Sequence, residues 1–247
     1  MKTVTPRLET LPPSQKNLWY QLGSVGDDFV LYGGTALSLQ LRGRQSIDFH
    51  FFTPTRVDVD ALSKRLPFLK GASLVQRALS TATFSVNCPA PVRISFFGGL
   101  DFGRVDEPCC FSDNRVTVAG LLDLAAQKIK VVQLRAEKKD YIDICTLLQS
   151  GLSLERALGA AQSLYPEFNP LMSLKALTFF DDGDLGTLTE SSRSLLIAAV
   201  SNVRDVPLVP KLDKSLLPRT RIPWRDPEQM IHDERPIPRD REPEIGE

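Results

Sequence analysis

The stretch Tyr32–Phe52, YGGTALSLQLRGRQSIDFHFF, decides the fold expected for this chain. A glycine pair, Gly33 and Gly34, separates a short apolar strand from a run in which Leu37 and Leu41 are four residues apart, the spacing of one helix face. Glycine allows a sharp backbone turn and the close approach of a ligand. The stretch therefore predicts a strand, a turn and a helix whose beginning suits an anion such as phosphate.

Thr35 is the residue expected to cap this helix. Its side chain would accept a hydrogen bond from a backbone N–H, and the remaining N–H groups would stay available to a ligand. For a glycine pair followed by threonine, taken alone, an ordinary tight turn with a threonine cap is the alternative.

The strand SIDFHFF that follows has two different faces. Alternation places Phe49 and Phe51 on one face and Asp48 and His50 on the other. Alternate residues of a strand are about 6.6 Å apart, so two such side chains can converge on one ion or one phosphate chain. Asp-x-Asp would suit two Mg²⁺ ions in phosphoryl or nucleotidyl transfer, but here the second acid is replaced by imidazole.

Three roles are open for His50 from the sequence alone. It could be a partly buried histidine hydrogen-bonded to Asp48 without a catalytic duty, a ligand of metal or phosphate, or a general base. Imidazole suits Mn²⁺ or Zn²⁺ better than Mg²⁺.

The composition excludes several functional classes. The chain has 247 residues, and its 30 Lys and Arg balance 30 Asp and Glu, so no overall charge attracts nucleic acid or an anionic membrane. No segment reaches the roughly 18 apolar residues that span a bilayer, and we expect a cytoplasmic protein without a membrane partner. The cysteines lack paired metal-ligand spacing, which argues against a zinc cluster.

The chain divides into three expected parts. Residues 1–118 mix helices and strands, residues 119–200 have helical periodicity, and residues 201–247 form a proline-rich, charged tail expected to be extended, either disordered or laid over the body. The first part is predicted to contain helices near residues 15–22 and 59–66 and strands at 29–32, 81–87 and 92–97. The second part is predicted to contain four helices.

Two charged groups stand out in the helical part. Lys128 interrupts the apolar stripe of its helix, which is costly unless the ammonium finds a partner. A phosphate would be such a partner, and a lysine reaching water at the edge of a groove is the alternative. In KKDYIDICTLL, Asp140 is a candidate N-cap with Asp143 in the first turn, and capping alone would account for both acids.

In these motifs the chain resembles the AbiEii/AbiGii nucleotidyltransferase-toxin family. The family pattern is a glycine pair with Ser or Thr, a helix, Arg, Ser or Thr and Asp-x-Asp, followed later by a helix Lys and a Lys-Asp-x-x-Asp element. The matches run from about residue 29 to residue 148. The resemblance implies an α+β fold: a DNA polymerase β-like nucleotidyltransferase domain with a mixed sheet, followed by a helical domain.

The resemblance also implies roles for individual residues. Asp48 and Asp140 would be catalytic, and Asp48 and His50 would hold Mg²⁺ or Mn²⁺. The residues implied in binding the nucleoside triphosphate (NTP) are Gly33, Gly34, Thr35, Arg44, Ser46, Lys128 and Lys139, with Arg135 beside them.

Two positions depart from the family pattern. His50 stands where the family has its second Asp, and Ser95 stands where a third acid is expected on a later strand. Nearby Asp101, Asp106 or Glu107 could substitute, but no spacing requires it.

The expected function is that of a bacterial toxin–antitoxin or phage-defence nucleotidyltransferase, which transfers NMP from NTP to an RNA, such as tRNA, or to a protein. A cognate antitoxin would be its partner. The alternative is a catalytically impaired member that binds a nucleotide or a protein. A third interpretation is a plain interaction protein whose proline-rich tail engages a partner, which predicts no pocket at Gly33.

Overall fold

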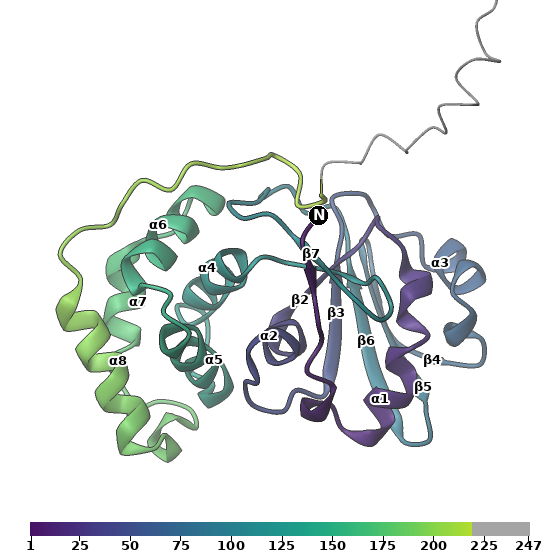
Figure 1. Ribbon diagram of the computed structural model, residues 1–247, viewed down its shortest axis with the longest axis horizontal. Coiled ribbons are helices and arrows are strands. Elements are labelled where there is room, and N and C mark those ends of the chain that lie inside the picture. Colours follow the sequence, from purple (N-terminus) through teal and green to yellow (C-terminus); the bar gives the residue numbers. More distant parts are fainter. Residues whose placement is uncertain (219–247) are drawn as a thin grey trace, which may run out of the picture.

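The computed structural model describes residues 1–218. Within them, a mixed sheet with helices on both faces adjoins a second group of helices (Figure 1). The strands are β1 (Thr3–Val4), β2 (Val30–Tyr32), β3 (Asp48–Phe52), β4 (Ser73–Ala78), β5 (Thr81–Asn87), β6 (Pro91–Phe97), β7 (Cys109–Phe111) and β8 (Thr117–Val118). The helices are α1 (Pro13–Trp19), α2 (Gly33–Leu41), α3 (Val59–Arg65), α4 (Leu121–Val131), α5 (Lys138–Gln149), α6 (Leu154–Leu164), α7 (Pro170–Ala176) and α8 (Glu190–Asn202).

The strands of residues 1–218 form one eight-stranded sheet in the order β1-β7-β8-β2-β3-β6-β5-β4. At its centre, β3 pairs antiparallel with β2 and parallel with β6. In this register His50 lies opposite Ser95 and Asp48 opposite Arg93. The sheet is mixed, and its helices complete an α+β fold, as the sequence predicted.

Alternation along β3 gives the sheet its two environments. Phe49 and Phe51 are fully buried, and Phe49 stacks on Trp19 of α1 with ring centroids 6.3 Å apart. Asp48 and His50 are half-buried and face the opposite side, where α2 lies between the sheet and the second group of helices (Figure 1). The strand therefore separates a dry aromatic core from a polar site.

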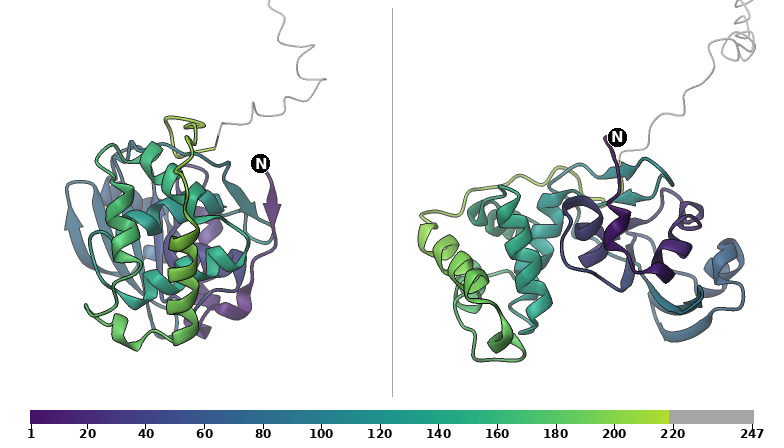
Figure 2. Two further views of the ribbon diagram at one scale, coloured as in Figure 1. Left: turned by 90° about the vertical axis from the view of Figure 1, so that its left-hand side faces the viewer. Right: turned by 60° about the horizontal axis from the view of Figure 1, so that its bottom comes forward.

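The second group consists of α4–α8, which lie together beside the sheet (Figure 2), and α4 contacts both α5 and α6. Both α4 and α5 also contact α2. No helix of residues 1–218 is long and apolar enough to cross a membrane.

After α8 the chain returns to the sheet as an extended strap, residues 203–217, over the top of the molecule in Figure 1. Along the way the carbonyl of Val209 accepts a hydrogen bond from the Ser163 hydroxyl of α6. At its end, buried Arg104 donates hydrogen bonds from Nη1 to the carbonyls of Ser215, at 2.8 Å, and Leu217, at 2.6 Å. The strap thus ties the helices to the sheet. The rest of the expected tail, 219–247, lies outside the described residues.

Candidate functional site

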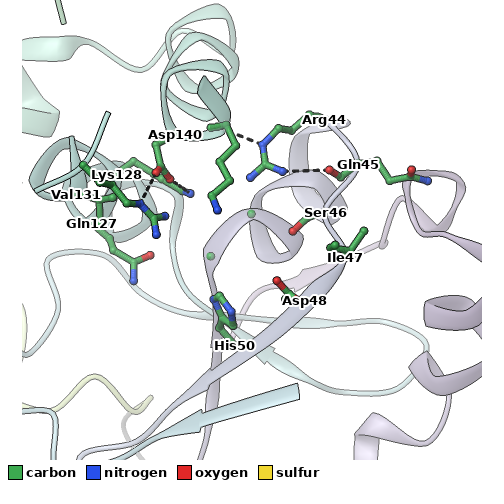
Figure 3. Close-up of a pocket in the computed structure, with 14 residues that line it drawn as sticks. Arg44, Gln45, Ser46, Ile47, Asp48, His50, Gln127, Lys128, Val131 and Asp140 are labelled. Carbon is green, nitrogen blue, oxygen red and sulfur yellow. Dashed lines mark hydrogen bonds and ion pairs between the residues drawn. The ribbon is translucent and has the colours of Figure 1, made fainter. Parts of the chain in front are cut away.

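A cavity of about 360 Å³ lies between the start of α2, the strand β3 and the helices α4 and α5 (Figure 3). We call it the glycine-pair pocket. Its lining residues are Gly33, Gly34, Arg44, Gln45, Ser46, Ile47, Asp48, His50, Gln127, Lys128, Val131, Arg135, Lys139 and Asp140. Of the site residues predicted from the sequence, only Thr35 is missing from this set.

The glycine pair lines the pocket, and side chains of other lining residues approach both glycines closely. Gly33 has a φ of +80°, and a Cβ added there would lie 3.0 Å from Nδ1 of His50. At Gly34 an added Cβ would lie 2.7 Å from Nη2 of Arg44 and 3.0 Å from Oγ of Ser46. Gly33 therefore needs glycine for its backbone conformation, whereas at Gly34 the absence of a Cβ leaves a small polar cradle beneath Arg44 and Ser46.

Thr35 does not cap α2. The helix begins at Gly33, its N-cap residue is Tyr32, and no side chain caps it. The Thr35 hydroxyl instead donates to the carbonyl of Asp48 at 2.7 Å, and the threonine is fully buried. It thus fixes α2 against β3 from behind the pocket.

Asp48 and His50 both reach the pocket, but no hydrogen bond joins them among residues 1–218. The Asp48 carboxylate also has no ion pair in this part of the chain. The imidazole of His50 meets the edge of Phe97, with ring centroids 5.7 Å apart. Burial lowers the pKa of His50, and the charge of Asp48 opposes this only in part. His50 is therefore a neutral imidazole at pH 7.

Ser95 does not take the place of a third acid in the pocket. It is buried on β6, and its hydroxyl forms a hydrogen bond with that of Thr83, at 2.9 Å. The strand register places Ser95 opposite His50. Its side chain, however, is hydrogen-bonded to Thr83 of the neighbouring strand β5.

Lys128 is buried and lies at the centre of a charge network. Its Nζ lies 2.8 Å from Oδ1 of Asp140 and 2.6 Å from Oδ2 of Asp143. Arg135 binds the second oxygen of Asp140 at 2.8 Å, and Arg44 lies 3.0 Å from each oxygen of Asp143. The partners of the Lys128 ammonium are thus the two acids of α5, and the lysine does not extend into water.

Asp140 is not an N-cap. The helix α5 begins at Lys138, and its N-cap residue Glu137 makes no capping hydrogen bond; the backbone N–H of Lys138 donates instead to Oδ1 of Asp184, at 2.5 Å. Burial alone would raise the pKa of Asp140, but the nearby charges of Lys128 and Arg135 outweigh it and the pKa is lowered. Asp140 is therefore an ionised acid, and together with Asp143 it holds the cations of the pocket wall in place.

The pocket lining has more cations than acids. Its charged side chains comprise four cations and two acids, a formal charge of +2. Two further acids outside the lining, Asp143 and Glu137, pair with these cations. The cations are Arg44, Lys128, Arg135 and Lys139, and the acids are Asp48 and Asp140.

The sequence matches a family of nucleotidyltransferases. The family model described as nucleotidyl transferase AbiEii toxin of type IV toxin–antitoxin systems matches residues 18–238. The chain belongs to this family. Membership in the AbiEii family implies a cognate antitoxin as partner.

The individual proteins that match this chain have low sequence identity to it. An uncharacterized protein of Aquifex aeolicus (strain VF5), aq_aa25, is 26% identical over 180 residues, which cover 71% of this chain and 85% of the relative. A candidate nucleotidyltransferase from H. pylori superposes with a TM-score of 0.50 and 15% identity, covering 76% of this chain and 92% of that one. An antigenic nucleotidyltransferase-like protein from Paracoccidioides brasiliensis superposes with a TM-score of 0.50 and 17% identity, covering 83% of this chain and 98% of that one. The two structures support the nucleotidyltransferase-like fold.

The AbiEii fold implies metal ions, and the donor set of this chain does not fit a two-metal centre. Within residues 1–218 no group of three or more His, Cys, Asp or Glu side chains could hold a metal ion. Asp48 and His50 face the pocket. Asp140 and Asp143 are instead ion-paired with Lys128, and the hydroxyl of Ser95 is hydrogen-bonded to Thr83.

Gln127 and Val131 line the pocket although neither was predicted as a site residue. With Arg135 they are spaced at i, i+4 and i+8 on α4, so one stripe of this helix forms a pocket wall. The spacing of Gln127, Val131 and Arg135 is the sequence signal that predicts this wall.

Proposed function

We propose that this protein binds a nucleoside triphosphate in the glycine-pair pocket and serves as a nucleotide-binding member of the AbiEii family. The observation that carries the proposal is the cradle at Gly34, which lies beneath the Arg44 guanidinium and the Ser46 hydroxyl. Both groups donate hydrogen bonds to phosphate oxygens, and Arg does so with charge assistance.

The surroundings of the cradle support a triphosphate in particular. The backbone at Gly33 and Gly34 begins a nine-residue helix, whose free N–H groups favour an anion. The cations Lys128 and Arg135 are held on the opposite wall by buried Asp140, so they need little reorganisation to meet a ligand. A chain of phosphates would then lie between two pre-arranged walls.

Replacing Gly34 by alanine tests this placement. The added methyl enters the cradle 2.7 Å from Nη2 of Arg44, and we expect nucleoside triphosphates to bind about ten-fold more weakly or worse. The fold should tolerate the change, since Gly34 does not have a positive φ and alanine is favoured over glycine in helices by about 1 kcal/mol. Isothermal titration calorimetry with ATP, GTP, CTP and UTP measures the affinities.

Gly186→Ala is the matched control because a Cβ there meets nothing within 4 Å. Its affinities should equal those of the wild type. Unchanged binding by Gly34→Ala would show that the triphosphate does not use the cradle.

A second candidate is transfer of NMP from the triphosphate to an RNA or protein acceptor. The unpaired Asp48 carboxylate in the pocket favours it, since an acid without a protein partner is available to a bound ligand. In that reaction an acceptor hydroxyl attacks the α-phosphorus and loses its proton to solvent, the bond from the α-phosphorus to the bridging oxygen breaks, and pyrophosphate leaves with the electron pair. Mg²⁺ or Mn²⁺ would be supplied in solution.

A transfer assay separates the two candidates. Because two of the family's metal acids are replaced, we expect wild type to transfer no label from α-labelled NTPs to total RNA or protein with Mg²⁺ or Mn²⁺. His50→Asp combined with Ser95→Asp restores those acids, and transfer by this variant alone would agree with the binding proposal. Label transfer by wild type that disappears in Asp48→Ala would overturn it in favour of the enzyme.

A further inference from the structure

The side chain of Gln127 has an unused hydrogen-bonding atom at the pocket. Its Oε1 is buried and has no hydrogen-bond partner among the described residues. Figure 3 shows its amide on the wall formed by α4, on the side of the cavity where His50 lies. A buried amide oxygen without a partner costs about 1–3 kcal/mol. Such an atom in a native structure needs an explanation, and a hydrogen-bond donor on a bound ligand is one.

Two uncharged side chains of the pocket lining lie beside each other on this wall. Gln127 and Val131 are one turn apart on α4, and both line the pocket. The lining cations nearest to them in the chain, Lys128 of the same helix and Arg135 just beyond its end, are ion-paired with Asp140 of α5. A ligand with one anionic and one uncharged portion therefore has a distinct place for each.

We infer that Gln127 recognises the nucleoside of the bound triphosphate by accepting a hydrogen bond at Oε1, an inference that rests on the proposed function. The donor belongs either to a ribose hydroxyl or to an N–H on the edge of the base. Val131 provides apolar contact beside it. Gln127 thus determines which triphosphate is preferred, while the glycine pair, Arg44 and Ser46 bind any of them through the phosphates.

Gln127→Met tests this inference because methionine has a similar length and shape but no amide. The probes are the four NTPs and inorganic tripolyphosphate, which has phosphates and no nucleoside. We expect the variant to bind the preferred NTP about ten-fold more weakly, the equivalent of one lost hydrogen bond to a ligand, and to bind tripolyphosphate as wild type does. Gln149→Met, at an exposed position of α5, is the control and should change neither affinity.

Two further measurements complete the experiment. The variant should be at least as thermostable as wild type, since it removes a buried amide that lacks a partner. The 2′-deoxy and 3′-deoxy forms of the preferred NTP identify the donor: if either binds wild type and variant equally, the missing hydroxyl is the donor. If both retain the difference, the donor is on the base.

Each contrary outcome identifies what fails. Equal losses for NTP and tripolyphosphate, or no loss for either, would overturn the role of Gln127 while leaving the phosphate site intact. Wild type that binds neither NTP nor tripolyphosphate would overturn the proposed function and this inference together.

Discussion

Replacing Lys128 by methionine is expected to lower the free energy of unfolding by about 3–5 kcal/mol, the usual cost of leaving a buried charge without its partner. Lys128 is 6% exposed and contacts two acids, Asp140 and Asp143, which are 0% and 1% exposed. Arg135 and Arg44 would remain as single partners of these acids. Urea denaturation of both proteins measures the difference.

Two comparisons show whether the cause is charge or packing. Lys130→Met removes a lysine of the same helix whose Nζ lies 4.2 Å from the ring centroid of Tyr165, and should cost about 1 kcal/mol. Adding Asp140→Asn and Asp143→Asn to Lys128→Met should recover part of the loss, since the buried negative charges disappear. A loss no larger than that of Lys130→Met would show that the network is not a source of stability.

Replacing Arg104 by methionine is expected to lower the free energy of unfolding by about 3 kcal/mol, because hydrogen bonds from a charged group contribute about 1.5–3 kcal/mol each. Arg104 is 1% exposed, and its two bonds to the strap would leave the carbonyls of Ser215 and Leu217 without that donor. The strap should therefore open more often. Hydrogen exchange of residues 203–217, followed by mass spectrometry, should become faster.

Arg204→Met is the matched control, since this arginine is on the strap but its side chain is exposed. Its stability and exchange should stay close to those of wild type. If Arg104→Met leaves the exchange of the strap unchanged, the strap is held by contacts other than Arg104.

The longer, two-faced elements of the fold could be predicted from the sequence. Strand β5 coincides with the predicted residues 81–87, and β6 begins one residue before the predicted 92–97. By contrast, all six residues of β4 are exposed, so no alternation marks it. The strands β1 and β8 have two residues each, too few for a period. Helix α8 was also not predicted, and Leu196 is its only fully buried residue.

At the site, residue types could be predicted better than partners. The glycine pair, Asp48 and Lys128 all reach one pocket, as the shared motif suggested. Thr35 and Asp140 looked like helix caps because capping partners are local in sequence. Their actual partners, the carbonyl of Asp48 and the ammonium of Lys128, are 13 and 12 residues away. Only the folded chain brings those atoms together.

The strap has a consequence for how the protein is synthesised. Arg104 belongs to the first half of the chain, whereas its carbonyl partners Ser215 and Leu217 leave the ribosome about a hundred residues later, since 111 and 113 positions separate them. Until then the guanidinium of Arg104 in a nascent chain has no strap carbonyls to accept its hydrogen bonds. The sheet and the helices that enclose the pocket can therefore be joined in their final form only after nearly the whole chain has been translated.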